Sequence, residues 1–386
     1  MLTCKAKLFI LLLGFVIVVL SLSVLVWRPR NAYQFLTKER KHSLVDIPQL
    51  FSNFKLASNI SSQKKMYKIL WYSKPRWIKE KLLECETNMH KCKQTNCIII
   101  NNRSLLLESN ALIFNVNGAN FPIKPPRNPL QRNQNQVWIF FGLESPQHYW
   151  YHRYRSPEWK SMFNWTMTYR LDSDIPHPYG VLLTKSNPTD RDYRTIFRAK
   201  KKFAVWIVSH CGAVSRRDAF VRLLQKYVPV DIYGACGKNC SSEAGECKAV
   251  IAKEYKFYLS FENSLCKDYV TEKFFKYFPL DLITVQRGYS DYDSMLPNDT
   301  YINTDKFSTV EELANFMTRL ADNEDEYILY LKAKDRYVTY RQPWTYCNAL
   351  CDICQRLNNL EMYKRSYNDI TSWLESDVCV KATDIK

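Results

Sequence analysis

The chain has 386 residues, more than one domain usually holds, so we expect two domains with additional segments. Hydrophobic residues make up 46% and charged residues 24%, which excludes wholesale disorder and a polytopic membrane protein. The formal net charge of +17 suits an anionic partner such as a phosphate-bearing ligand, without by itself indicating nucleic acid. Neither a dinucleotide-binding G-x-G-x-x-G nor a P-loop occurs among the 9 glycines.

An uncharged apolar run from Leu8 to Trp27 dominates the N-terminal region. As a helix it would be about 30 Å long, enough to cross the hydrocarbon core of a bilayer. The apolar part of a cleavable signal peptide is shorter, roughly 7–15 residues, and ends in small residues, whereas Arg28 follows directly here. We therefore expect a tail at 1–7, a transmembrane signal anchor at 8–27 and a basic, polar stem at 28–66.

Cysteines and glycosylation sequons indicate the compartment of the remaining chain. Of 13 cysteines only Cys4 precedes the apolar run, which leaves an even number after it. Five sequons also follow the run, at Asn59, Asn102, Asn164, Asn239 and Asn298. Together they favour an oxidising lumen and a type II orientation with a short cytosolic tail. The alternative is a reduced cytosolic domain whose cysteines are buried as small hydrophobes.

Short apolar runs rich in β-branched residues recur in two successive series, as is typical of strands buried on both faces of a parallel sheet. The first series consists of residues 68–72, 97–100, 111–114 and 137–141, and the second of 203–208, 228–233, 257–261 and 281–285. Helical stretches such as 216–227 and 271–277 alternate with the second series, and a capping-box pattern at Thr309 opens another helix. The sequence therefore predicts an α/β protein with two Rossmann-like domains.

Polar segments follow several predicted strands, at the edge where open α/β sheets bind ligands. Glu144 comes just after the apolar run 137–141, and a carboxylate partly withdrawn from water is a candidate general base. The alternative is a solvated glutamate before the turn at Pro146. Asp172-Ser-Asp174 has the D-x-D spacing by which many sugar-nucleotide enzymes hold Mn²⁺, although such triplets are common by chance.

Two further segments of this kind precede predicted helices. Ser209 and an arginine of the pair Arg216–Arg217 could reach a diphosphate near a helix N-terminus, the alternative being two exposed arginines. At the next junction Asp268 is the candidate N-cap, and lysine and glutamate side chains could contact phosphate and sugar hydroxyls. The polar groups crowded at that junction are Glu262, Asn263, Tyr269, Glu272 and Lys273.

The last junction also carries a recognisable motif. Phe261-Glu-Asn-Ser264 followed by Lys267-Asp-Tyr-Val-Thr-Glu-Lys273 resembles the signature of the α1,3-fucosyltransferase family. The resemblance extends over about residues 68–375, nearly all of the chain after the predicted stem. Other segments match the family in the same order, at 144–146, 163–166, 169–170, 172–175, 178–180, 206–209 and 231–234.

The resemblance implies the GT-B arrangement, in which two Rossmann-like domains face a cleft. The N-terminal domain, 67–195, would bind the acceptor and supply the base; the second, 196–345, would bind GDP-fucose; and 346–386 would return to the first. Glu144 is then the catalytic base. The implied donor-binding residues are Arg217, Asn263, Tyr269, Glu272 and Lys273. Asp172 and Asp174 then belong to a cleft-facing motif, so no metal site is expected and a divalent metal is at most stimulatory.

The implied function is inverting transfer of L-fucose from GDP-fucose, in α1,3 linkage, to GlcNAc of glycoprotein glycans. The implied location is the Golgi membrane, single-pass type II, with the catalytic domain in the lumen. The alternative from another class is a non-catalytic lumenal glycan-binding protein that keeps the fold. No nucleic-acid partner is expected, because the aromatic residues fall within predicted strands. The choice between antennal and core GlcNAc stays open, as does the oligomeric state.

Three residues depart from the family pattern. His210 stands where the family usually has asparagine. Gln286 and Arg287 stand where small apolar residues are common, which puts the affinity for the donor in question.

Cys351 and Cys354 have the C-x-x-C spacing of zinc sites and redox motifs, but no second C-x-x-C pair is present in the sequence. The family resemblance instead implies that each of them pairs with one cysteine of a group near the start of the first domain, namely Cys85, Cys92 and Cys97. The sequence leaves open the pairing of Cys211, Cys236, Cys240, Cys247, Cys266, Cys347 and Cys379.

Overall fold

The computed structural model describes residues 65–127, 132–239 and 244–385. The predicted tail 1–7, the anchor 8–27 and the stem up to residue 64, which includes the sequon at Asn59, lie outside these ranges. Within them, no helix has both the length and the apolar character needed to cross a membrane.

Six strands form the first sheet, in the order β2-β1-β3-β4-β5-β6, and every neighbouring pair is parallel. The strands are β1 (Tyr67–Ser73), β2 (Cys97–Ile100), β3 (Ala111–Asn115), β4 (Val137–Gly142), β5 (Trp165–Thr168) and β6 (Ile175–Pro176). Both β3 and β4 are buried along their whole length, because both faces of this sheet are covered. This burial explains why their sequences are unbroken apolar runs.

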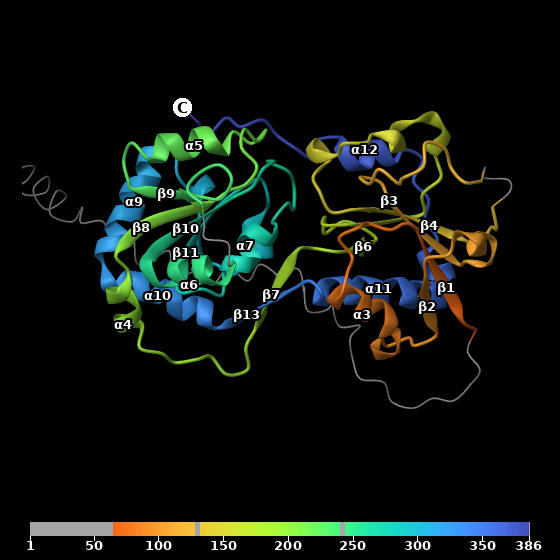
Figure 1. Ribbon diagram of the computed structural model, residues 1–386, viewed down its shortest axis with the longest axis horizontal. Coiled ribbons are helices and arrows are strands. Elements are labelled where there is room, and N and C mark those ends of the chain that lie inside the picture. Colours follow the sequence, from red (N-terminus) through yellow and green to blue (C-terminus); the bar gives the residue numbers. More distant parts are fainter. Residues whose placement is uncertain (1–64, 128–131, 240–243, 386) are drawn as a thin grey trace, which may run out of the picture. The chain divides into compact units, whose positions relative to one another are not determined.

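Helices cover both faces of the first sheet (Figure 1). On one face, α11 (Trp344–Asn358) and α3 (Lys81–Thr87) pack with the strand residues Trp71 and Phe141. On the other, α12 (Ile370–Glu375) joins an aromatic cluster around Trp138. Short 3-10 turns complete this half: η3 (Met89–Lys91), η4 (Arg103–Glu108), η6 (Pro146–His148), η7 (Arg153–Arg155), η8 (Pro157–Trp159) and η10 (Leu360–Tyr363).

Five parallel strands form the second sheet, in the order β12-β11-β10-β8-β9. They are β8 (Lys202–Ile207), β9 (Val230–Tyr233), β10 (Tyr255–Phe261), β11 (Ile283–Arg287) and β12 (Tyr301–Asn303). The core on one face includes α4 (Tyr193–Ala199), α5 (Arg217–Leu224), α9 (Val310–Asp322) and α10 (Glu324–Asp335). Residues of α6 (Ala244–Glu254) and α7 (Glu272–Tyr277) pack on the other, and α8 (Tyr292–Met295) and η9 (Thr304–Lys306) follow β11 and β12. The two sheets confirm the predicted α/β class.

The helix predicted after Thr309 is α9. The Thr309 hydroxyl accepts a hydrogen bond from the backbone N–H of Glu312 at 3.1 Å, and the Glu312 carboxylate accepts one from the N–H of Ser308 at 2.8 Å. These two bonds satisfy N–H groups that would otherwise have no partner at the start of the helix.

The structure shifts the expected domain limits. The predicted boundary after residue 195 falls inside α4, whose Tyr193 and Phe197 pack in the core of the second sheet. The boundary after residue 345 falls inside α11, which packs on the first sheet. Because a helix packs as a unit, the boundaries belong before α4 and before α11. The chain passes from one sheet to the other before α4 and again before α11. An antiparallel pair of strands, β7 (Gly180–Thr184) with β13 (Tyr337–Arg341), lies next to both of these points.

The end of the chain also departs from the expectation that 346–386 returns to the first domain. After α12, Cys379 forms a disulfide with Cys266 in the loop after β10. Asp384 then accepts two hydrogen bonds from the guanidinium of Arg287 at the end of β11, at 2.6 and 2.8 Å. The final residues are therefore attached to the second half of the molecule.

Three disulfides attach α11 to the start of the first sheet, namely Cys85–Cys347, Cys92–Cys351 and Cys97–Cys354. The three cysteines of α11 follow one another at i, i+4 and i+7, so they lie on one face of the helix. Cys351 and Cys354 thus pair with the expected group and not with each other. A further bond, Cys211–Cys236, connects the loops after β8 and β9.

Candidate active site

Each sheet has one point where its strand order reverses, between β1 and β3 and between β8 and β10. The connections that leave two such strands diverge and leave a crevice at their carboxyl ends. The loops after β1 and β3 line a cavity of about 1040 Å³, here called the large cavity. The loops after β8 and β10 line one of about 370 Å³, the small cavity. Both cavities share the lining residues Glu144, His210, Asn263 and Glu272, so they meet there.

Glu144 follows the end of β4 at this meeting point. The strand ends at Gly142, where a Cβ would lie 1.9 Å from the Tyr149 hydroxyl, so a larger residue does not fit. The phenol of Tyr269 donates a hydrogen bond to Oε2 of Glu144 at 2.8 Å. No side chain in the described part of the chain hydrogen-bonds Oε1, which therefore remains available to a ligand.

Arg217 is the first cation of the small cavity. It is 3% exposed, and its guanidinium donates to the carbonyls of Phe261 at 2.8 Å and His210 at 2.9 Å. Its Nε has no hydrogen-bond partner among the described residues. Arg216 is exposed and does not line the cavity. The residue pattern alone did not show which of the two arginines could reach a ligand. The structure shows that it is Arg217 that lines the cavity.

Lys273 is the second cation of the small cavity. Its ammonium donates to the Thr271 hydroxyl at 2.8 Å and lies 3.2 Å from Glu262 and 3.3 Å from Glu272. Burial raises the pKa of Glu262, which is fully enclosed. Burial alone would lower the pKa of Lys273, but the two glutamates outweigh it and raise that pKa, so the ammonium stays charged. Lys276, which sequence reasoning missed, also lines the cavity.

The expected base and the expected donor-binding residues meet here. The small cavity is lined by the expected base and by the five expected donor-binding residues, namely Glu144, Arg217, Asn263, Tyr269, Glu272 and Lys273. The stacked rings of Tyr258 and Tyr277, 4.1 Å apart, form part of the wall. Chemically, this cavity can hold a polyphosphate between fixed cations.

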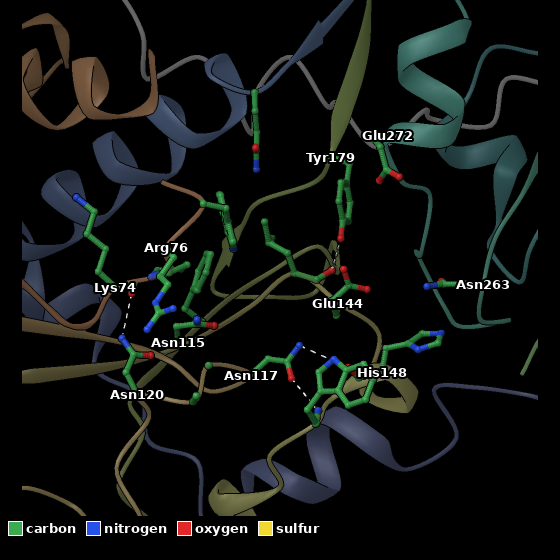
Figure 2. Close-up of a pocket in the computed structure, with 18 of the residues that line it drawn as sticks. Lys74, Arg76, Asn115, Asn117, Asn120, Glu144, His148, Tyr179, Asn263 and Glu272 are labelled. Carbon is green, nitrogen blue, oxygen red and sulfur yellow. Dashed lines mark hydrogen bonds between the residues drawn. The ribbon is translucent and has the colours of Figure 1, made fainter. Parts of the chain in front are cut away.

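The large cavity is lined on the side of the first sheet by amides and indoles (Figure 2). Trp77 and Trp150 are 46% and 79% exposed, and the Asn117 amide accepts a hydrogen bond from the backbone of Trp150. Figure 2 shows the Arg76 guanidinium directed into the cavity and the Lys74 side chain directed away from it. Exposed aromatic faces beside amides suit a ligand with both C–H faces and hydroxyls. Sequence reasoning missed these residues, although they follow the ends of two predicted strands.

The three departures from the family pattern fall in different places. His210 lines both cavities, and its ring meets that of His148 edge-on at 5.6 Å. Gln286 and Arg287 are fully buried and line neither cavity. Because Arg287 holds the end of the chain through Asp384, its role is structural, and the expected effect on the donor has no geometric basis.

Asp174 is occupied by internal contacts. Its carboxylate accepts from the Thr166 backbone N–H at 2.9 Å and from the Tyr367 phenol at 2.8 Å, and Asp172 pairs with Arg170 at 2.6 Å. Within the described ranges, no group of three metal-ligating side chains occurs.

Asp268 is not the N-cap of α7, as the sequence suggested. Thr271 caps this helix, and Asp268 accepts a hydrogen bond from the N–H of Leu171 at 3.2 Å. The cap therefore lies three residues beyond the expected one, because the Asp268 carboxylate is used to hold the loop before the helix.

The sequons differ in accessibility. Asn102, Asn239 and Asn298 are exposed. Asn164 is only partly exposed, and its amide group donates to the carbonyl of Arg365 at 3.1 Å and accepts from the N–H of Trp138 at 2.9 Å. In the folded chain, Asn164 is therefore the least available of these four acceptors.

Two parallel sheets, each with a cavity at its switch point, define a two-domain α/β architecture with a candidate binding site at each sheet. The family profile described as "Glycosyltransferase family 10 (fucosyltransferase) C-term" matches residues 197–373, and the one described as "Fucosyltransferase, N-terminal" matches residues 64–180. The chain belongs to glycosyltransferase family 10, the fucosyltransferases.

Individual relatives agree with this assignment. The chain is 34% identical over 315 residues to "Alpha-(1,3)-fucosyltransferase C" of Drosophila melanogaster, an alignment covering 75% of this chain and 71% of the relative. It is 33% identical over 287 residues to "Alpha-(1,3)-fucosyltransferase 7" of Rattus norvegicus, covering 73% and 72%. A solved structure titled "Crystal Structure of alpha1,3-Fucosyltransferase" superposes with a TM-score of 0.53 over 82% of this chain and 98% of that chain, at 15% identity. This last likeness shows the expected GT-B-like fold.

Proposed function

We propose that the chain transfers L-fucose from GDP-fucose, in α1,3 linkage and with inversion, to GlcNAc of glycoprotein glycans. The observation that carries the proposal is the position of Glu144, whose free carboxylate oxygen stands where a cavity lined by cations meets one lined by amides and indoles. The relatives named as α1,3-fucosyltransferases support the reaction and the linkage.

The donor would occupy the small cavity. Hydrogen bonds and ion pairs hold Arg217 and Lys273 in place before a ligand binds. Binding of a diphosphate therefore requires little rearrangement of these side chains. Lys276 adds a further positive charge at the same wall. Because side-chain cations can neutralise the diphosphate, the proposed reaction requires no metal, and a divalent ion is at most stimulatory.

The acceptor would enter from the large cavity. Its hydroxyl gives its proton to Oε1 of Glu144 as the oxygen forms a bond to the anomeric carbon of fucose. The bond from that carbon to the β-phosphate oxygen breaks on the opposite face, and its electron pair leaves with GDP. Arg217 and Lys273 stabilise the charge that grows on the phosphate, while the sugar ring passes through an oxocarbenium-like state.

The proposed location is the Golgi membrane, with residues 8–27 as the anchor and the catalytic body in the lumen. The disulfides among the described cysteines support an oxidising compartment.

The test is a transfer assay with a defined acceptor panel. A secreted form beginning near Lys64 would receive GDP-fucose with either an antennal or a core N-glycan acceptor. We expect an α1,3-fucosylated GlcNAc from at least one acceptor, and that product also reports inversion, because fucose is β-linked in the donor. Binding of GDP and glycan without transfer to either acceptor would favour the glycan-binding alternative and overturn the proposal.

A further inference from the structure

Tyr269 connects the donor side of the site to the base. It follows β10 in the second half of the chain, whereas Glu144 follows β4 in the first. Its phenol is 1% exposed, lines the small cavity and donates to Oε2 of Glu144 at 2.8 Å. Burial raises the pKa of Tyr269 well above its ordinary value, so the phenol keeps the proton that it donates.

The position of this phenol is fixed from several sides. The ring meets Tyr169 edge-on at 4.9 Å and Tyr179 at 6.2 Å. The residue before it, Asp268, is tied to the backbone of Leu171 at 3.2 Å. The same loop is held by the disulfide between Cys266 and Cys379. A side chain constrained in this way can fix the orientation of a group that it contacts.

The hydrogen bond is made to one carboxylate oxygen only. A carboxylate at the end of a flexible glutamate side chain rotates unless a partner holds it, and a proton acceptor must point at the hydroxyl that it deprotonates. With Oε2 held by Tyr269, Oε1 is the oxygen left for the acceptor. The residue matched to donor binding by family resemblance therefore touches the base directly.

We propose that Tyr269 is the positioning residue of the general base, and that its hydroxyl holds Oε2 of Glu144 so that Oε1 faces the acceptor hydroxyl. The proposal rests on the proposed function and adds a role for the donor half of the site in orienting the base. Tyr269 itself takes no proton from the substrate; it acts through Glu144.

Tyr269→Phe removes the hydroxyl and keeps the ring. A hydrogen bond to a charged group predicts a fall in kcat of about 10- to 100-fold, with donor KM and GDP affinity changed less than about threefold. Tyr169→Phe is the matched control, because Tyr169 is equally buried and its hydroxyl has no hydrogen-bond partner among the described residues. The control is expected to keep kcat within about twofold, and thermal unfolding would show that both variants fold.

A double-mutant comparison separates positioning of the base from packing of the ring. In a Glu144→Gln background, Tyr269→Phe should cause no further loss.

A loss confined to donor KM, or full additivity with Glu144→Gln, would overturn the role of Tyr269. If the wild type transfers no fucose to either acceptor, the proposed function fails instead. The two failures are therefore distinguishable in one set of variants.

Discussion

At the scale of single residues, identical side chains in this chain have different surroundings and therefore different roles. Lys267 and Lys273 lie in the same motif, but Lys267 pairs with Asp172 at 3.3 Å and is half-exposed. Lys273 is largely enclosed and lies in the small cavity between two glutamates. Spacing along the sequence could locate the two lysines but could not show which ammonium lies in the small cavity.

Replacing these lysines separately tests the donor site. Lys273→Ala should raise the KM for GDP-fucose by about tenfold or more, because a held cation is lost and the buried Glu262 loses its cationic neighbour. Lys267→Ala should change it less than about twofold, because a half-exposed ion pair contributes little. Steady-state kinetics over a range of donor concentrations measures both. Equal effects would indicate a general electrostatic attraction rather than a site.

His177 makes stability depend on pH. Its ring is fully buried, packs near Phe141 and Tyr346, and has no hydrogen-bond partner on either nitrogen among the described residues. Burial lowers the pKa of His177 to about 3. Below its unfolded pKa of about 6.5, the unfolded chain binds the proton and the folded chain does not, so stability is fully present above that value and is lost as the pH falls towards 3.

Urea unfolding at pH 7.5 and pH 5.5 measures this effect. The wild type should lose about 1.4 kcal/mol more between these pH values than His177→Leu, which has no proton to bind. His90→Leu is the control, because His90 is exposed. The same pH dependence in wild type and His177→Leu would contradict the argument.

At the scale of elements, α11 is the helix that attaches the C-terminal part of the chain to the start of the first sheet. Its three cysteines face β2, α3 and η3, and their bonds span more than 250 residues each. The resemblance implied two of these bonds, and the third follows from helical geometry, because Cys347 lies one turn before Cys351. Residue spacing without the helix could not have excluded a bond inside the C-x-x-C pair.

The three bonds should contribute unequally when they are removed in turn as alanine pairs. When one of the three disulfides is removed and two remain, only a short loop between neighbouring cysteines is released. The chain-entropy model predicts that this lowers the free energy of unfolding by about 3 kcal/mol or less. Removal of the last disulfide releases the full loop, and the same model predicts a loss of about 5 kcal/mol in the free energy of unfolding. Denaturant unfolding of single, double and triple pair removals measures the series. Equal increments, or recovery of a Cys351–Cys354 peptide from the wild type by non-reducing mapping, would contradict this arrangement.

At the scale of the whole molecule, the sequence predicted the elements whose residue pattern depends on local burial alone. Parallel strands buried on both faces must be apolar throughout, so runs such as 137–141 predicted β4 to within a residue. The pair β7 and β13 was missed, because its strands are half-exposed and pair across about 150 residues. The lining of the large cavity was missed because neutral amides and indoles carry no motif, whereas Glu144 and the Lys273 segment do.

Both sheets contribute a cavity at their switch points, and the site arises where these cavities share Glu144. A carboxylate at that position can reach a hydroxyl on one side while a phosphate leaves on the other. The proposed transfer therefore depends on whether Glu144 acts as the base.

Glu144→Gln tests this role of Glu144, because the amide keeps the size of the side chain and cannot take a proton. Transfer from GDP-fucose to the better acceptor should fall by about 10²–10⁴-fold, while GDP affinity measured by calorimetry stays within about threefold. The Tyr269 hydrogen bond can persist to the amide oxygen, so the fold should be retained, as thermal unfolding would show. A variant that transfers fucose at a near-normal rate would contradict the role of Glu144 as the base.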